Sequence, residues 1–470
     1  MSDKEKLFQD FDAIDTASWN SKIIKDLKGA DYNEKLLSNT AEGIVIKPFY
    51  NSDDLQSHPP LSHYRKDNDW GVCQEIIVND SKKANTEALT YLNKGATSLI
   101  FFMEVDCDPE VLLKDILIEH ISVHYVVNGD PLPFYTQLEN LIKARSLDPM
   151  SIKGSIGFDP LCKLAASGEF YTNEKDDLNT FHSLLERNTT AMYCFAINAA
   201  LYHNAGATAS EELGIAMAHA HEYVHHHNKC AATPLFIKLA VGSNYFMEIA
   251  KLRAVRQLWT LIMGEYDSKT SLHIHCETAW RNKTIFDPYV NMLRTTTEAM
   301  SAVMGSCDSL TVKAFDNCYK HSNEFGQRIA RNQQLILKGE SYADKVNDPA
   351  AGAYYIESLA HQLAEKALEV FKQIEAKGGF IEALISSYIQ DMIAKSATRQ
   401  VEAFDKGERV LLGSNIYPNT AEKMSEEMEH THAFYEASTA DTLVQPIPVK
   451  RLSEAYEHER LKSESSKSNS

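Results

Sequence analysis

The chain lacks the cysteine spacing of a structural zinc site or a redox dithiol. Its eight cysteines are scattered over 470 residues, and no two of them form a C-x-x-C pair. Zinc ribbons and thioredoxin-like motifs depend on such pairs. We therefore expect free thiols, most of them buried, in a protein of the reducing cytoplasm.

Long apolar runs and an excess of positive charge are also missing. No run of about 18 apolar residues occurs, so no membrane span is predicted, and no apolar signal segment follows the polar N-terminus. The net charge is −18, whereas binding to a nucleic-acid backbone needs clustered Lys and Arg. Neither G-x-G-x-x-G nor a Walker A phosphate loop is present. These absences favour a globular protein that binds neither nucleic acid nor membrane.

From Trp70 onward the chain alternates short β-rich runs with helical segments. Amphipathic stretches such as Tyr245–Met263 and Pro288–Met304 lie between the runs. Strand–helix alternation repeated eight times predicts a (β/α)8 TIM barrel, with a doubly wound open sheet as the alternative. The eight runs are Gly71–Val78, Ser98–Glu104, His120–Val127, Ser151–Phe158, Ala191–Asn198, Leu235–Val241, Leu272–Thr278 and Ser309–Phe315.

Local signals support the helices. In residues 245–263 the apolar positions recur every three or four residues, which places Lys251, Arg253 and Arg256 on the opposite, polar face. An Asp N-cap followed by Pro at the first helical position is a favoured helix start. Such Asp-Pro pairs begin at residues 108, 130, 148, 159, 287 and 348.

Composition divides the chain into three parts. Residues 1–69 carry short apolar clusters and turns, which suits an extended N-terminal arm that packs on something else. Residues 70–405 hold the predicted barrel and a C-terminal helical extension that includes Glu324–Leu337 and Glu357–Ile374. Residues 406–470 are predicted to be a linker and a disordered tail, because the final residues are all polar.

The most tempting short motif is His221-Glu222-x-x-His225. It matches the H-E-x-x-H of zinc hydrolases, in which two histidines bind zinc and the Glu activates water. The segment is predicted to be helical, and further histidines crowd it. TIM-barrel chemistry, however, lies on the loops after the strands. We therefore favour a solvated polar helix face over a zinc hydrolase.

Other candidate side chains lie in predicted strands. Alternation places His273 and His275 on one face and Cys276 on the other. If the first face is the barrel interior, His275 is a metal ligand or acid/base group or, as we favour, a histidine hydrogen-bonded within the core. Glu75 and Glu104 are unusual as charged strand residues, and they form either a carboxylate pair or ion pairs with Lys or Arg.

Several long segments resemble methylmalonyl-CoA mutase. Residues 40–50 resemble T-x-E-G-I-x-x-x-P-L-Y, residues 244–259 resemble N-x-F-x-E-I-A-K-x-R-A-x-R-x-L-W, and residues 287–295 resemble D-P-Y-N-N-x-x-R-T. Residues 328–333 and 348–354 also match the family. The resemblance implies a TIM barrel for a coenzyme A thioester that enters along the barrel axis, and an N-terminal arm that wraps a partner subunit.

The first departure from this family concerns its catalytic tyrosine. The family's catalytic chain has R-P-W-T-I-R-Q-Y, whose Tyr steers the radical rearrangement. The corresponding stretch here keeps Trp70 and Gln74 but has Asn68 in place of the first Arg and Glu75 in place of the Tyr. The resemblance therefore implies a barrel without the steering hydroxyl.

The second departure concerns the family's catalytic histidine. In G-Y-H-x-Q-E-A-G-A this His donates a hydrogen bond to the thioester carbonyl. An ungapped comparison puts Leu201 at that position, with His203 two residues later. A leucine has no hydrogen to donate, and losing such a donor costs about 3 kcal/mol of oxyanion stabilisation.

The family's cobalamin-binding part is also not found. The cobalt-ligating motif D-x-H-x-x-G is absent, and the roughly 50 residues after Pro418 are too few for a flavodoxin-like domain. We thus expect no catalytic, cofactor-binding or metal-binding residue on this chain. The resemblance implies a chemically inert small subunit of a heterodimer, whose large catalytic subunit binds adenosylcobalamin and converts (R)-methylmalonyl-CoA to succinyl-CoA. The alternative is the catalytic barrel of a split acyl-CoA mutase, with the cobalamin domain on a separate chain.

Overall fold

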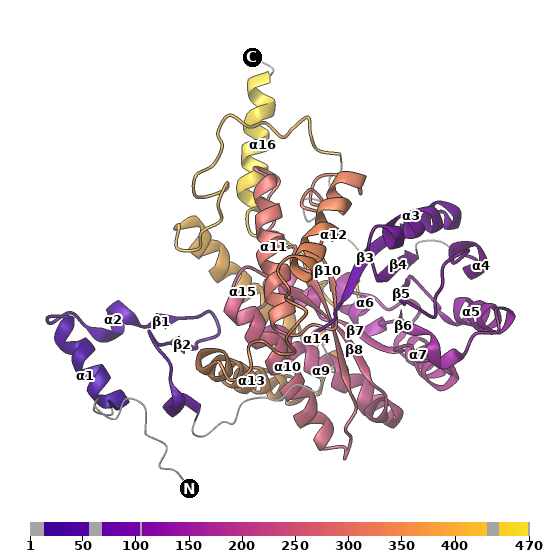
Figure 1. Cartoon of the computed structure of the whole chain (residues 1–470), viewed down its shortest axis with the longest axis horizontal. Coiled ribbons are helices and arrows are strands. Elements are labelled where there is room, and N and C mark those ends of the chain that lie inside the picture. Colours follow the sequence, from indigo (N-terminus) through magenta and orange to yellow (C-terminus); the bar gives the residue numbers. More distant parts are fainter. Residues whose placement is uncertain (1–13, 56–67, 104–105, 430–440, 469–470) are drawn as a thin grey trace, which may run out of the picture.

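Eight parallel strands form the centre of the computed structural model, which describes residues 14–55, 68–103, 106–429 and 441–468 (Figure 1). The strands are β3 (Gly71–Val78), β4 (Ser98–Met103), β5 (Ser122–Val127), β6 (Lys153–Gly157), β7 (Phe195–Asn198), β8 (Leu235–Val241), β9 (Leu272–Thr278) and β10 (Ser309–Thr311). Every predicted run contains one of them, and β3, β8 and β9 coincide with their runs residue for residue.

The sheet closes on itself, which makes it a barrel and excludes the open doubly wound alternative. The strand order is β6-β5-β4-β3-β10-β9-β8-β7. Across the two ends of that order, Ile156 N donates to Tyr193 O over 2.9 Å and Tyr193 N donates to Gly154 O over 2.8 Å. This β6–β7 seam is a short bridge rather than an extended ladder, so side-chain contacts must help to hold it closed.

Helices surround the barrel and continue beyond it (Figure 1). The segments predicted to be helical correspond to α9 through α13. The helices are α3 (Ser81–Asn93), α4 (Pro109–Leu112), α5 (Leu132–Ala144), α6 (Pro160–Ser167), α7 (Glu174–Arg187), α8 (Ala200–Ala205), α9 (Ala209–His226), α10 (Tyr245–Gly264), α11 (Tyr289–Met304), α12 (Glu324–Gly339), α13 (Tyr354–Glu375), α14 (Phe380–Ile385), α15 (Tyr388–Asp405) and α16 (Glu454–Ser468), with short 3-10 turns η2 (Pro149–Ser151) and η3 (Asn228–Ala232).

The predicted polar face of α10 is wrong for two of its residues. Lys251 and Arg253 are both 0% exposed. Arg253 pairs with Asp348 and with Glu357 of α13, and Lys251 Nζ lies 2.7 Å from a Glu212 carboxylate oxygen. Because α13 packs on α10 beside Arg253 and α9 packs on it beside Lys251, carboxylates replace water as the partners of the buried cations.

The N-terminal segment extends away from the barrel (Figure 1). It contains α1 (Thr16–Asp26), α2 (Tyr32–Leu36), β1 (Ser38–Asn39) paired antiparallel with β2 (Val45–Ile46), and the 3-10 turn η1 (Ser52–Leu55). Neither α1 nor α2 buries a residue. These helices therefore gain little stability from contacts within their own chain.

The C-terminal residues predicted to form a linker and a disordered tail include the helix α16, which extends to Ser468. Glu464 accepts hydrogen bonds from Met424 N and Ser425 N, both over 3.0 Å, and Leu461 packs against a small apolar cluster. These contacts bind a polar helix to the segment that follows α15.

The cysteines are as predicted. All eight carry thiols that are not joined in disulfides, and six of them are buried. In the part of the chain that the structure describes, no helix is both long and apolar enough to cross a membrane.

Asp159, the first residue of an Asp-Pro pair, strengthens the β6–β7 seam. It N-caps α6, and its Oδ1 accepts from Cys162 N (3.0 Å), His219 Nε2 (2.9 Å) and the Tyr223 hydroxyl (2.8 Å). Its Oδ2 accepts from the backbone N–H of Asn198 (2.9 Å), the last residue of β7. One carboxylate thus joins the end of β6 to the end of β7 and to α9.

Aromatic rings and hydroxyls fill the barrel near the N-terminal ends of the strands. The Phe236 ring lies 5.0 Å from the rings of His124 and His273 and 5.8 Å from that of His275, measured between centroids. Ser309 Oγ lies 2.8 Å from His275 Nδ1 and 3.0 Å from His273 Nε2. His275 is fully buried. The prediction of a core histidine held by hydrogen bonds is therefore confirmed.

We predict that Asp159→Asn destabilises the chain by about 3 kcal/mol or more, because buried donors lose a charged acceptor. Asp108→Asn is the matched control, since Asp108 N-caps α4 and accepts from Glu110 N over 2.9 Å; its loss should cost about 1 kcal/mol. Urea unfolding followed by circular dichroism measures both values. Equal losses for the two variants would contradict the proposed role of Asp159.

The buried histidines predict acid sensitivity. Burial lowers the pKa of His124 to about 3, and the neighbouring His273 adds to the shift. Because the unfolded chain takes up this proton near pH 6.5 and the folded chain does not, stability falls as pH decreases from 6.5 towards 3, by about 1.4 kcal/mol per pH unit. His124→Gln should remove this contribution to the slope, and substitution of the exposed His225 by Gln should leave it unchanged. Denaturant unfolding between pH 4 and pH 7 tests both expectations.

Candidate functional site

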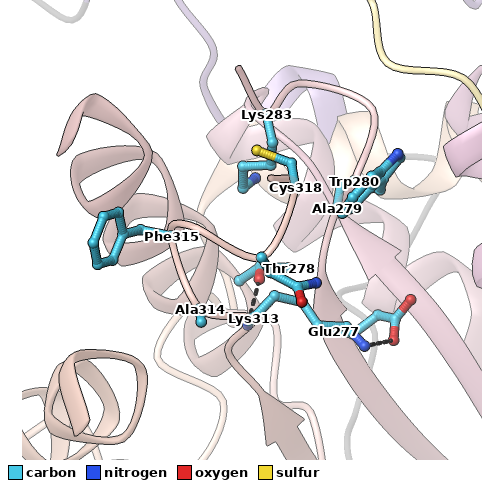
Figure 2. Close-up of a pocket in the computed structure, with 10 residues that line it drawn as sticks. Glu277, Thr278, Ala279, Trp280, Lys283, Lys313, Ala314, Phe315 and Cys318 are labelled. Atoms are coloured by element: carbon cyan, nitrogen blue, oxygen red, sulfur yellow. Dashed lines mark hydrogen bonds and ion pairs between the residues drawn. The ribbon is translucent and has the colours of Figure 1, made fainter. Parts of the chain in front are cut away.

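A small recess opens at the C-terminal ends of the barrel strands, the end at which TIM-barrel sites form (Figure 2). It measures about 300 Å³ when the solvent-filled mouth is included, and its walls follow β9 and β10. The lining residues are Glu277, Thr278, Ala279, Trp280, Lys283, Lys313, Ala314, Phe315, Asn317 and Cys318.

Four charged side chains at this end of the barrel form one chain of ion pairs, which we call the ion-pair tetrad. Lys313 Nζ lies 2.6 Å from Glu75 Oε2 and 3.2 Å from Glu277 Oε2. Lys238 Nζ lies 2.9 Å from the same Glu277 oxygen. The side chains come from β3, β8, β9 and the residues after β10, so the tetrad spans the interior; Figure 2 shows Lys313 and Glu277 next to each other.

Electrostatics within the tetrad keep its central pair charged. Burial raises the pKa of Glu277, but the charges of Lys238 and Lys313 outweigh burial and bring that pKa to about 2. For Lys313, burial alone would lower the pKa, but the nearby carboxylates of Glu277 and Glu75 outweigh burial. The pKa of Lys313 is therefore raised. Glu75 therefore forms an ion pair, one of the two predicted alternatives. The other strand carboxylate, Glu104, lies outside the described residues.

Glu75 points into the barrel, whereas Trp70 and Gln74, the two nearby residues that match the family, point outward. Gln74 Oε1 accepts from Arg331 Nη1 of α12 over 3.0 Å, and Trp70 Nε1 donates to Gln334 Oε1 of the same helix over 3.3 Å. The kept residues thus pack β3 against α12. The changed residue occupies the inward position at which the family resemblance places the steering tyrosine.

The second expected catalytic position is apolar. Leu201 lies in α8 and is buried. Two residues later, His203 Nδ1 lies 3.3 Å from Glu212 Oε2, and that oxygen is also 2.7 Å from Lys251 Nζ. The imidazole at this end of the barrel is therefore turned towards a buried carboxylate.

The H-E-x-x-H residues lie on α9, where two of them contact residues of the C-terminal helices. His221 Nδ1 lies 3.0 Å from Glu375 Oε2, and Glu222 accepts from Phe380 N over 2.6 Å. Glu222 is 8% exposed, so the prediction of a solvated face is correct for His225 and wrong for Glu222. Among the residues the structure describes, no group of three His, Cys, Asp or Glu side chains could hold a metal ion.

Sequence reasoning missed Lys238, Glu277 and Lys313 as parts of this site. Lys238 and Glu277 are charged residues inside predicted strands, which is the signal that singled out Glu75. Lys313 lies in the predicted run Ser309–Phe315 and carries the same signal.

The residues described after α15 do not fit a corrin ring. Residues 406–429 and 441–468 contain α16 and turns, but none of the strand–helix units of a flavodoxin-like domain. No histidine in these ranges lies in a D-x-H-x-x-G sequence.

Comparisons with known proteins agree on one family. The family model described as methylmalonyl-CoA mutase matches residues 103–457. A methylmalonyl-CoA mutase small subunit of Porphyromonas gingivalis is 33% identical, over 99% of this chain and 79% of the relative. A small subunit of Streptomyces virginiae is 29% identical, over 85% of this chain and 68% of the relative.

Longer relatives match the same barrel. A methylmalonyl-CoA mutase of Rhizobium meliloti is 31% identical over 85% of this chain, and the chain spans 63% of that protein's length. The large subunit of the Streptomyces virginiae mutase is 27% identical over 81% of this chain and 59% of its own length. The sheet closes into a (β/α)8 barrel, the family model matches most of the chain, and one relative is 33% identical over 99% of the chain. This chain therefore belongs to the methylmalonyl-CoA mutase family.

Proposed function

We propose that this chain is the chemically inert small subunit of a heterodimeric, adenosylcobalamin-dependent methylmalonyl-CoA mutase of the cytoplasm. In support, relatives named small subunits match it over most of their length, and Streptomyces virginiae has both a small and a large subunit that resemble it. In this proposal the larger chain binds adenosylcobalamin and converts (R)-methylmalonyl-CoA to succinyl-CoA. This chain contributes contacts to the complex and no reacting group.

The observation that carries the proposal is the pairing of Glu75 with Lys313. A carboxylate 2.6 Å from an ammonium group is held in a charged pair and cannot act as the neutral hydroxyl that the family uses at this position. At the second position Leu201 cannot polarise a thioester carbonyl. At both positions this chain therefore lacks the catalytic side chain that the family resemblance places there.

The filled barrel axis supports the same conclusion. His124, Phe236 and His275 are 2%, 6% and 0% exposed. A coenzyme A arm that followed the axis would have to displace these packed rings, and close-packed cores tolerate such displacement poorly.

We predict that the purified chain, given adenosylcobalamin and methylmalonyl-CoA, forms no succinyl-CoA. Co-expression with the larger homologous chain from the same organism should yield a one-to-one complex that does, because that chain supplies the reacting groups. Chromatography of the coenzyme A esters measures the product. Turnover by the isolated chain would refute the proposal and would favour a split mutase.

A substitution within the complex gives a second test. Glu75→Gln should change kcat/KM of the complex by less than about twofold, because the reaction takes place in the partner. The same substitution should destabilise this chain by about 2 kcal/mol, because it removes a partly buried ion pair. The matched control replaces the tyrosine at the corresponding position of the larger chain and should abolish turnover. A loss of kcat of tenfold or more with Glu75→Gln would assign catalysis to this barrel.

A further inference from the structure

Residues 442–452, which we call the strap, join the helices on the two sides of the β6–β7 seam. Ile447 N donates to Ala165 O of α6 over 2.8 Å, and Lys450 N donates to Asn204 O of α8 over 3.3 Å. Because α6 follows β6 and α8 follows β7, the two contacts lie on opposite sides of the seam, at the C-terminal ends of its strands. The strap therefore bridges the place where the barrel closes.

The sequence of the strap favours an extended chain. Pro446 and Pro448 each fix φ at about −65°. The residue before a proline is kept out of the helical region, which here applies to Gln445 and Ile447. Ile447 stands between the two prolines and keeps its N–H, and this donor is the one bonded to Ala165 O. A chain that is extended before it docks loses less conformational entropy when it docks.

Apolar side chains of the strap are buried. Val444, Ile447 and Leu452 are 4%, 2% and 4% exposed, and the first two belong to the main core. Val444 N also donates to Gly168 O over 3.2 Å. Gly168 is the C-cap of α6 with φ +83°, and a Cβ at this position would lie 2.5 Å from Val444 O. A glycine here therefore allows the strap to lie directly against α6.

The far end of the strap is bound to the wall of the recess. Leu452 N donates to Arg281 O over 2.7 Å, and Arg281 Nη1 donates to Lys450 O over 2.7 Å. Asn204, whose carbonyl accepts from the strap, also accepts from Trp280 N through its side-chain oxygen over 2.8 Å. Since Trp280 lines the recess, the strap links the seam to the loop after β9.

The seam is the shortest junction between neighbouring strands in the described part of the barrel. One bridge joins Ser155 at β6 to Tyr193 before β7, whereas every other pair of neighbouring strands is in register over three residues or more. Local opening has the lowest free energy where few contacts hold a structure together.

We propose that the strap holds the β6–β7 seam closed, and that the seam opens only when the strap leaves α6. The buried side chains, the backbone hydrogen bonds to both flanking helices and the stiffness of the Pro446–Pro448 segment all favour the attached state. This role is independent of the proposed function, because it involves neither a ligand nor a second chain.

Hydrogen–deuterium exchange of the full chain, followed by mass spectrometry of its peptides, tests the role of the strap. In the unsubstituted chain, peptides that contain Ile156 and Tyr193 should exchange faster than those of β8 and β9, because the seam opens locally. Ile447→Ala should speed exchange of the seam peptides at least tenfold, because it removes a buried side chain that holds the strap on α6. Leu443→Ala is the matched control: Leu443 lies in the same strap but is 61% exposed, so its loss should change exchange less than about twofold.

A second variant keeps the test decisive if Ile447→Ala does not fold, which circular dichroism shows. Pro446→Gly combined with Pro448→Gly retains the Ile447 side chain and its N–H but makes the detached strap more flexible. Exchange of the seam peptides should become about threefold faster or more. Seam peptides that exchange as slowly as those of β8 and β9 in the unsubstituted chain would overturn the proposal. Seam exchange that stays unchanged in the folded strap variants would overturn it as well.

Discussion

The barrel depends on how its two terminal strands are held together. A short backbone bridge joins β6 to β7, and the Asp159 carboxylate adds acceptors for the backbone of Asn198 and for two side chains of α9. A carboxylate that satisfies several buried donors is stable as an anion, so this link is electrostatic as well as geometric. The closed interior exists because this seam stays closed.

Closure creates an interior with two chemically different layers. Near the N-terminal ends of the strands, His124, Phe236 and His275 form one layer. Burial lowers the pKa of both histidines, which keeps this layer uncharged. Near the C-terminal ends, the ion-pair tetrad forms a layer of two acids and two bases. In the first layer, serine and threonine hydroxyls contact His124 Nδ1 and both ring nitrogens of His275. In the second layer, each charged group lies beside one of opposite sign.

Local sequence patterns were enough to predict the barrel. The features that these patterns did not predict depend on contacts between residues far apart in the sequence. The apolar runs define β3, β8 and β9 because burial on both faces of a parallel strand leaves a continuous signal. The burial of Arg253 could not be predicted, since its partners lie 95 and 104 residues further along the chain. For the site, the sequence showed that Glu75 is unusual, but Lys313 lies 238 residues away and no spacing rule connects the two. Likewise, the polar composition of α16 hid the hydrogen bonds that Glu464 accepts.

The charge balance of the tetrad constrains which residues this end of the barrel can carry. A tyrosine in place of Glu75 would leave the ammonium groups of Lys238 and Lys313 to share the single carboxylate of Glu277, and an excess cation in a largely buried site is destabilising. A neutral side chain at position 75 is therefore compatible with this interior only when one of the two lysines is replaced as well.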